Sequence, residues 1–289
     1  MPHTVWRNTR ALPQSTRMSP DYSWSFNPGA ILAVAIVAAV YGRRWRTVRR
    51  TEGARGAPTI RLVSFMAGLV VVLIAVVSPV DRLAEQLFSM HMVQHMLLLD
   101  VAPILCLLGL TRILLRPGTK RLQYVERRAG PFGHPLFAAF LYGTTMWVWH
   151  IPALYDAALE HPVVHVLEHL AFTFVGGLYW WHLLSPIRSR QRLTGLGPLA
   201  YMGTTKLSLG ILGIALTFAP TVFYDFYENQ PEYWGLSHLA DQQVGGMIMA
   251  LEQAVIMGAA FCLLFIRMLG ESEREEQRRE RYEDTAEAL

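Results

Sequence analysis

The sequence predicts an all-α, polytopic membrane protein with seven transmembrane helices, and three observations lead to this prediction. Its 289 residues are 52% hydrophobic and 17% charged, whereas soluble domains average about 25% charged residues. Seven apolar runs are close in length to the roughly 20 residues that a helix needs to cross the hydrocarbon core of a bilayer. Basic residues gather in every second segment between these runs, which is typical of cytoplasmic loops.

The first three predicted spans lie in the N-terminal half of the chain. Gly29–Tyr41 is short, but the aromatic residues Trp24 and Phe26 extend it upstream, and we expect it to serve as the insertion signal. Ile60–Ser78 follows an arginine-rich segment and stops before a proline. Ser89–Leu110 ends just before a second basic segment. We expect no cleavable signal peptide before these spans.

Four further spans follow the second basic segment. Leu136–Ile151 and Val163–Leu184 each begin directly after a proline, Pro198–Ala219 begins at a Gly-Pro step, and Val244–Met268 ends at a charged tail. These boundaries divide the chain into an outer N-terminal tail, a seven-helix transmembrane domain and a cytoplasmic charged tail, at residues 1–27, 28–268 and 269–289.

The basic residues predict the orientation of the chain. Three alternate loops are rich in Lys and Arg, whereas the intervening loops hold only Arg82. The basic residues of these three loops are Arg43, Arg44, Arg46, Arg49, Arg50, Arg55 and Arg61; Arg112, Arg116, Lys120, Arg121, Arg127 and Arg128; and Arg188, Arg190 and Arg192. This bias predicts an outer N-terminus and a cytoplasmic C-terminus.

Composition also excludes several function classes. The formal net charge of +4 is accounted for by the basic loops, so we predict no nucleic-acid binding. The sequence shows no internal repeat, no glycine-rich phosphate loop and no nucleotide-binding fingerprint.

The histidines concentrate at the predicted outer face. His91 and His95 lie in the first outer turns of the third span, His150 at the outer end of the fourth, and His165 and His169 in the first turns of the fifth. Residues four apart share one face of a helix, so each pair presents two imidazoles from one stripe. Two such pairs on adjacent helices predict a metal site that includes His150, because ionisable groups in spans are costly and usually functional. Interfacial anchoring and hydrogen bonding between helices are the alternatives.

Nearby methionines favour copper as the metal. Met90, Met92 and Met96 flank the first histidine pair, and Met247 and Met249 open the seventh span. Imidazole together with thioether suits copper, and the cuprous ion in particular. Zinc with imidazole ligands, or a haem held by opposed histidines, are the alternatives.

Four further ionisable residues in the predicted spans need partners. Asp100 and Lys206 come to similar depths at the rise of an α-helix, so we expect a structural ion pair between them. Glu252 lies near the same depth and is expected to join either Lys206 or the histidines. Glu168, beside His169, is expected to orient an imidazole.

Four ordered motifs resemble the CtaG family of seven-helix cytochrome c oxidase assembly factors, the kind associated with caa-type oxidases. These motifs are HMVQHMLLL, MWVWHIPALYDAAL, HPVVHVLEHLAFTFVGGLYWW and DQQVGGMIM. The resemblance covers about Pro79 to Leu264. Its matching positions are the five histidines above, and Asp241 with Gln242 before the paired Gly245 and Gly246.

The resemblance implies a bacterial inner-membrane protein without enzymatic activity, acting in assembly of the respiratory chain. It implies a chaperone-like role in copper delivery to the catalytic subunit of a haem-copper oxidase, with copper donor proteins as further partners. A membrane haem or metal-dependent redox protein is one alternative. A copper or proton-coupled transporter with a water path along Asp100, Lys206 and Glu252 is another.

Overall fold

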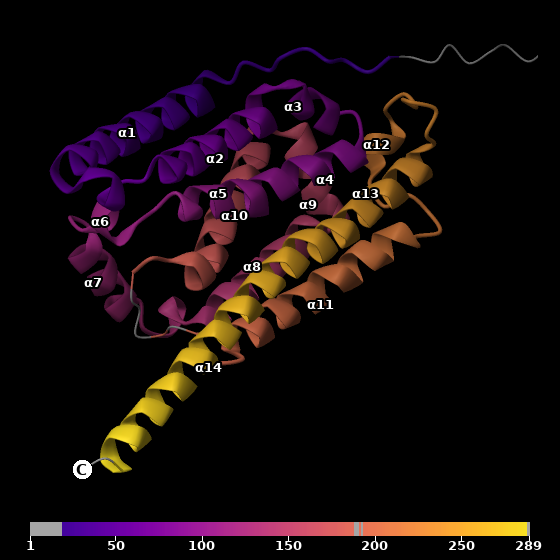
Figure 1. Ribbon diagram of the computed structural model, residues 1–289. Helices are drawn as coiled ribbons and strands as arrows, with labels where there is room; N and C mark the ends of the chain where they lie inside the picture. The colour runs from indigo at the N-terminus through magenta and orange to yellow at the C-terminus, as the bar shows by residue number, and fades with distance from the viewer. Residues whose placement is uncertain (1–18, 188–190, 192, 288–289) are drawn as a thin grey trace, which may run out of the picture.

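The computed structural model describes residues 19–187, 191 and 193–287, and its regular elements are all helical within those residues (Figure 1). In chain order they are α1 Pro28–Gly56, α2 Thr59–Val77, α3 Pro79–Ala84, α4 Phe88–Met96, η1 Leu97–Val101, α5 Ala102–Leu108, α6 Arg112–Leu115, α7 Thr119–Ala129, η2 Gly130–Gly133, α8 Pro135–Trp149, α9 Pro152–Glu160, α10 Pro162–Leu184, α11 Gly197–Thr217, α12 Asp225–Glu228, α13 His238–Glu252, η3 Gln253–Met257 and α14 Gly258–Glu287.

Four helical segments of the described chain are long and apolar enough to cross a membrane. They are Thr59–Val77, Phe88–Leu108, Pro162–Leu184 and Gly197–Thr217, and each coincides with a predicted span to within a few residues. The other three predicted spans also fall on helices, in α1, in α8 and in α13 through α14. Of these, α8 has only 15 residues, and α1 and α14 each join an apolar half to a charged half.

The outward faces of the long helices are apolar. Valine, isoleucine and leucine side chains project from α2, α10 and α11 without protein neighbours to cover them, as at Val70, Leu170 and Ile211. A patch of this kind around a whole bundle is typical of contact with lipid rather than water. The interior between α4, α8, α10, α11 and α13 is filled by aromatic residues, with Tyr142, Phe172 and Tyr179 completely buried.

Helices α6 and α7 lie at one end of the bundle, and α3 and α12 lie at the opposite end (Figure 1). Two arginines of the first basic loop donate hydrogen bonds to helix carbonyls at the end that holds α6. Arg44 donates two hydrogen bonds of 3.0 Å to the carbonyls of Ile113 and Leu114, and Arg61 donates to the carbonyl of Leu108. These carbonyls belong to the last turns of α5 and α6, where the regular N–H donor four residues further along the helix is missing. The basic residues predicted to face the cytoplasm therefore also cap helix ends.

Two π-helical turns interrupt the long helices. Pro103 has no N–H to donate to the carbonyl of Leu99, and η1 lies directly before it. The freed carbonyl lies against Gly176 of α10, where any Cβ would overlap it. The second turn, η3, separates α13 from α14, which continues as a helix to Glu287 through most of the predicted charged tail (Figure 1).

Candidate metal centre

The N-terminal end of α4 is fixed by an acidic residue from another helix. Leu87 precedes α4 and has no side-chain acceptor for the first N–H groups. Asp241 in the first turn of α13 supplies it, accepting from the N–H of Phe88 at 2.6 Å, from the N–H of Ser89 at 3.3 Å and from the Ser89 hydroxyl. A carboxylate at a helix N-terminus satisfies free donors and complements the helix dipole. Asp241 thus sets the position of the histidine-bearing turns of α4.

A tyrosine near the N-terminal end of α4 selects the tautomer of His91. The Tyr227 hydroxyl donates its hydrogen to the carbonyl of Ala84 at 2.6 Å, so toward His91 Nδ1, 3.2 Å away, it is an acceptor. His91 therefore carries a hydrogen on Nδ1, which leaves a lone pair on Nε2 in the neutral ring. That lone pair faces Nε2 of His95, 2.7 Å away, and a hydrogen-bond partner on the opposite nitrogen is usual for metal-binding histidines.

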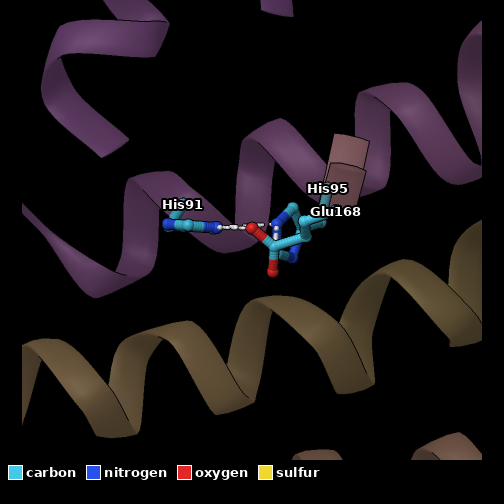
Figure 2. Close-up of side chains that lie close together, drawn as sticks. All are labelled: His91, His95 and Glu168. Atoms are coloured by element: carbon cyan, nitrogen blue, oxygen red, sulfur yellow. Dashed lines mark hydrogen bonds and ion pairs between the residues drawn. The ribbon is translucent and has the colours of Figure 1, made fainter. Parts of the chain in front are cut away.

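His91 and His95 converge on Glu168 (Figure 2). The two Nε2 atoms are 2.7 Å apart, and they lie 3.5 and 3.4 Å from the two carboxylate oxygens. The exposed fractions are 0% for His91, 2% for His95 and 0% for Glu168. An anionic group buried this deeply needs compensation by a positive charge, which a doubly protonated imidazole or a metal ion supplies.

The second pair completes the cluster from α10. His165 and His169 flank Glu168 on one face of the helix, and both are half-buried. Their rings face those of the first pair, with centroids 5.6 Å apart for His91 and His165, and 6.2 Å apart for His95 and His169. Glu168 belongs to two groups of ligand atoms close enough for one ion, with His91 and His95 and with His165 and His169. We call these five residues the histidine–carboxylate centre.

Several polar atoms of this centre have no hydrogen-bond partner among the described residues. They are His95 Nδ1, His165 Nε2, His169 Nε2 and both oxygens of Glu168. Buried polar atoms are nearly always satisfied, so a group of unsatisfied lone-pair donors in one place fits an ion. Imidazole and carboxylate ligands suit copper or zinc.

The helices that carry the two histidine pairs are closely packed. The His95 and Phe172 rings are 4.3 Å apart, and α10 touches the backbone of η1 at Gly176 and Leu99. The Glu168 carboxylate lies close to ligand atoms of both pairs.

His150 lies beside the centre and has partners of its own. Its ring is 6.4 Å from that of His95, Nδ1 is 2.7 Å from the carbonyl of Met146, and Nε2 is 3.5 Å from the sulfur of Met92. Two further histidines lie outside the centre: His161 is exposed, and His238 contacts the carbonyl of Gln230 at 2.9 Å. The structure therefore brings five of the predicted site residues together and places His150 at their edge.

The predicted ion pair between Asp100 and Lys206 is wrong. Asp100 accepts from the Tyr142 hydroxyl at 2.9 and 3.0 Å and from Trp180 Nε1 at 2.7 Å. Lys206 instead donates to the carbonyl of Gln253 at 2.9 Å. Equal depth in the bilayer does not determine the direction in which a side chain points around its helix. The rotation of α11 about its axis directs Lys206 toward η3.

Two features of the centre were not predicted. Glu168 was expected only to orient an imidazole, yet its carboxylate lies between both pairs; its position three residues after His165 was the available signal. Tyr227 comes from a short helix in a loop, and no sequence pattern indicates its contact with His91.

The family model described as cytochrome c oxidase caa3 assembly factor, Caa3_CtaG, matches residues 39–271. Uncharacterized protein Mb0105 of Mycobacterium bovis and uncharacterized protein MT0111 of Mycobacterium tuberculosis are each 26% identical over 240 residues, 78% of this chain and 36% of theirs. Uncharacterized protein ML1998 of Mycobacterium leprae is 26% identical over 247 residues, with the same coverage. The chain thus spans 36% of the length of these curated relatives. No solved structure matches.

Proposed function

Because the chain belongs to the cytochrome c oxidase caa3 assembly factor family, we propose that it delivers copper to the catalytic subunit of a haem-copper oxidase. In this proposal copper is the cargo and the histidine–carboxylate centre holds it. The role is that of a chaperone in the bacterial inner membrane, with no reaction catalysed. Copper donor proteins on the outer side are the expected source of the ion.

The observation that carries the proposal is the convergence of four imidazoles on one buried carboxylate. Ligand atoms from α4 and α10 lie close to the same carboxylate, and the Nε2 atoms of His165 and His169 have no hydrogen-bond partner among the described residues. The single negative charge of Glu168 compensates one positive charge, which favours a cuprous ion or a cupric ion that keeps an anionic ligand from the donor. His165 and His169 are half-buried whereas His91 and His95 are buried, so an arriving ion meets the α10 pair first.

The proposal includes seven spans, with the N-terminus outside and the C-terminus in the cytoplasm. Four helices have the required length, and the three shorter apolar segments in α1, α8 and α13 through α14 supply the remainder. The arginine-capped end then faces the cytoplasm by the positive-inside rule, and the centre faces outward.

Single substitutions of the four histidines by Gln test the proposal. Metal content is measured after purification without chelator, and oxidase activity is measured in membranes of the host. We expect copper in the wild type, and a loss of copper affinity of at least tenfold per folded protein in each variant. His165→Gln and His169→Gln should keep normal protein abundance, because these two rings are only half-buried. Excess external copper should restore part of the oxidase activity by mass action.

His161→Gln is the matched control, since His161 directly precedes α10 but is exposed and outside the centre. It should retain both copper and oxidase activity. Normal oxidase activity in all four centre variants would mean that the imidazoles are interfacial anchors. Zinc in place of copper would overturn the copper assignment.

A membrane haem protein is the competing function from another class. An absorption spectrum of the purified chain separates the two, because haem gives a Soret band. We expect none, since the helices that carry the two histidine pairs are closely packed.

A further inference from the structure

A histidine nitrogen and a methionine sulfur meet beside the centre with no hydrogen between them. The carbonyl of Met146 can only accept, so His150 carries a hydrogen on Nδ1 at this 2.7 Å contact. In the neutral ring, Nε2 then carries a lone pair and no hydrogen. It lies 3.5 Å from Met92 Sδ, which is also a lone-pair atom. The contact is therefore no hydrogen bond, and two ligand atoms face one point.

Their separation matches two ligands of one metal ion. With bond lengths of about 2.0 Å to imidazole nitrogen and about 2.3 Å to sulfur, as at zinc, a 3.5 Å separation gives an angle of about 109° at the metal. That angle is tetrahedral. His150 and Met92 are both buried, so neither side chain needs a large movement or solvent exchange to keep this arrangement.

Further thioethers surround a small cavity that begins at Met92. Its volume is about 20 Å³, enough for one water molecule or one ion, and four methionines line it: Met92, Met96, Met146 and Met249. His95 also lines it, so the cavity adjoins the histidine–carboxylate centre. Methionine is common filler in apolar cores, but thioether groups from three different helices at one cavity also form a soft ligand set.

The other end of the cavity is rich in hydrogen-bond acceptors. Asp100, Glu252 and Gln253 line it, all of them buried. Glu252 Oε1 and Gln253 Oε1 have no hydrogen-bond partner among the described residues. Buried oxygens without donors favour a cation nearby over an empty apolar space.

We propose that these residues form a second metal site, specific for a soft monovalent cation such as the cuprous ion. His150 Nε2 and Met92 Sδ are two of its ligands, and thioethers of Met96, Met146 and Met249 are the candidates for the rest. The buried oxygens at the far end supply further lone pairs. This site extends the proposed function, because its ligands include none of the five residues of the histidine–carboxylate centre and it is therefore tested separately.

Silver(I), a soft monovalent ion without redox chemistry, is the probe. Its affinity and stoichiometry are measured on the purified full-length chain in detergent, and X-ray absorption at the silver edge reports whether sulfur is bound. We expect a sulfur-containing site in the wild type, and affinity at least tenfold weaker in Met92→Leu and in His150→Gln. Leucine replaces methionine at nearly equal volume, so folding should be retained.

Met90→Leu is the matched control, because Met90 packs against Leu83 and Leu87 away from the cavity. It should bind silver as the wild type does. Met249→Leu tests the same site from α13 should Met92→Leu not fold. His165→Gln should leave silver binding intact while it weakens cupric binding, which separates this site from the histidine–carboxylate centre. Wild-type silver affinity in both Met92→Leu and Met249→Leu, or absorption spectra without sulfur, would refute the second site.

Discussion

Replacing Asp241 by Ala should destabilise the chain and impair the centre at the same time. The change removes the acceptor of the Phe88 and Ser89 N–H groups, which are almost completely buried. A buried donor left without a partner costs about 1–3 kcal/mol, and loss of a helix N-cap costs about 0.5–2 kcal/mol. The 2.6 Å bond to Phe88 belongs at the upper end of this range, and the 3.3 Å bond to Ser89 at the lower end. We therefore expect Asp241→Ala to lower the free energy of unfolding by about 3 kcal/mol.

Thermal unfolding in detergent is the assay. A loss of about 3 kcal/mol should lower the apparent melting temperature by about 6–10 °C in a chain of this size. Asp241→Asn keeps one side-chain oxygen and should lose about half as much. Asp225→Ala removes an exposed carboxylate at the same end of the bundle and should change little. Copper affinity should fall with Asp241→Ala, because the first turn of α4 carries His91.

The reasoning fails if Asp241→Ala and Asp225→Ala have the same apparent melting temperature. It also fails if the melting temperature falls as expected but copper affinity is unchanged, because the cap would then stabilise α4 without positioning His91.

Two further predictions concern packing and topology. Gly176→Val should cut the amount of folded protein sharply, because its Cβ would overlap the backbone carbonyl of Leu99, which has no rotamer to change; Gly177→Val meets open space and should be tolerated. Equal membrane abundance and melting temperature of the two variants would contradict this. In a chain without its native cysteines, Glu160→Cys in α9 should react with an impermeant thiol reagent added outside, and Arg121→Cys in α7 only after permeabilisation. The reverse labelling would put the centre on the cytoplasmic side.

The parts of the fold that could be predicted are those set by local pattern. Val163–Leu184 was predicted where α10 runs from Pro162 to Leu184, because a long apolar helix bounded by proline leaves little freedom in its ends. The i,i+4 spacing likewise assigns His91 and His95 to one face without knowledge of the fold. What could not be predicted depends on tertiary geometry. Hydropathy gives a residue its depth but not its direction around the helix, and for that reason Lys206 was paired with the wrong partner.

The same limit applies to the π turns. An extra residue in a helical turn rotates all following residues about the helix axis, so other side chains face the bundle interior. The apolar composition of the segment does not reveal this rotation. Asp100 lies within η1 and Glu252 directly before η3, so their common cavity follows from two register changes that the sequence does not display.

The length of α14 makes it a lever arm with its base at η3. Its 30 residues span about 45 Å at the rise of an α-helix. A bend of about 5° at the base therefore displaces the far end by about 4 Å, a movement well within reach of a spectroscopic distance measurement. The base adjoins Glu252 and Gln253, whose side chains line the methionine cavity. A spin label on exposed Arg278 would consequently magnify angular changes at the cavity that are too small to detect at the cavity itself.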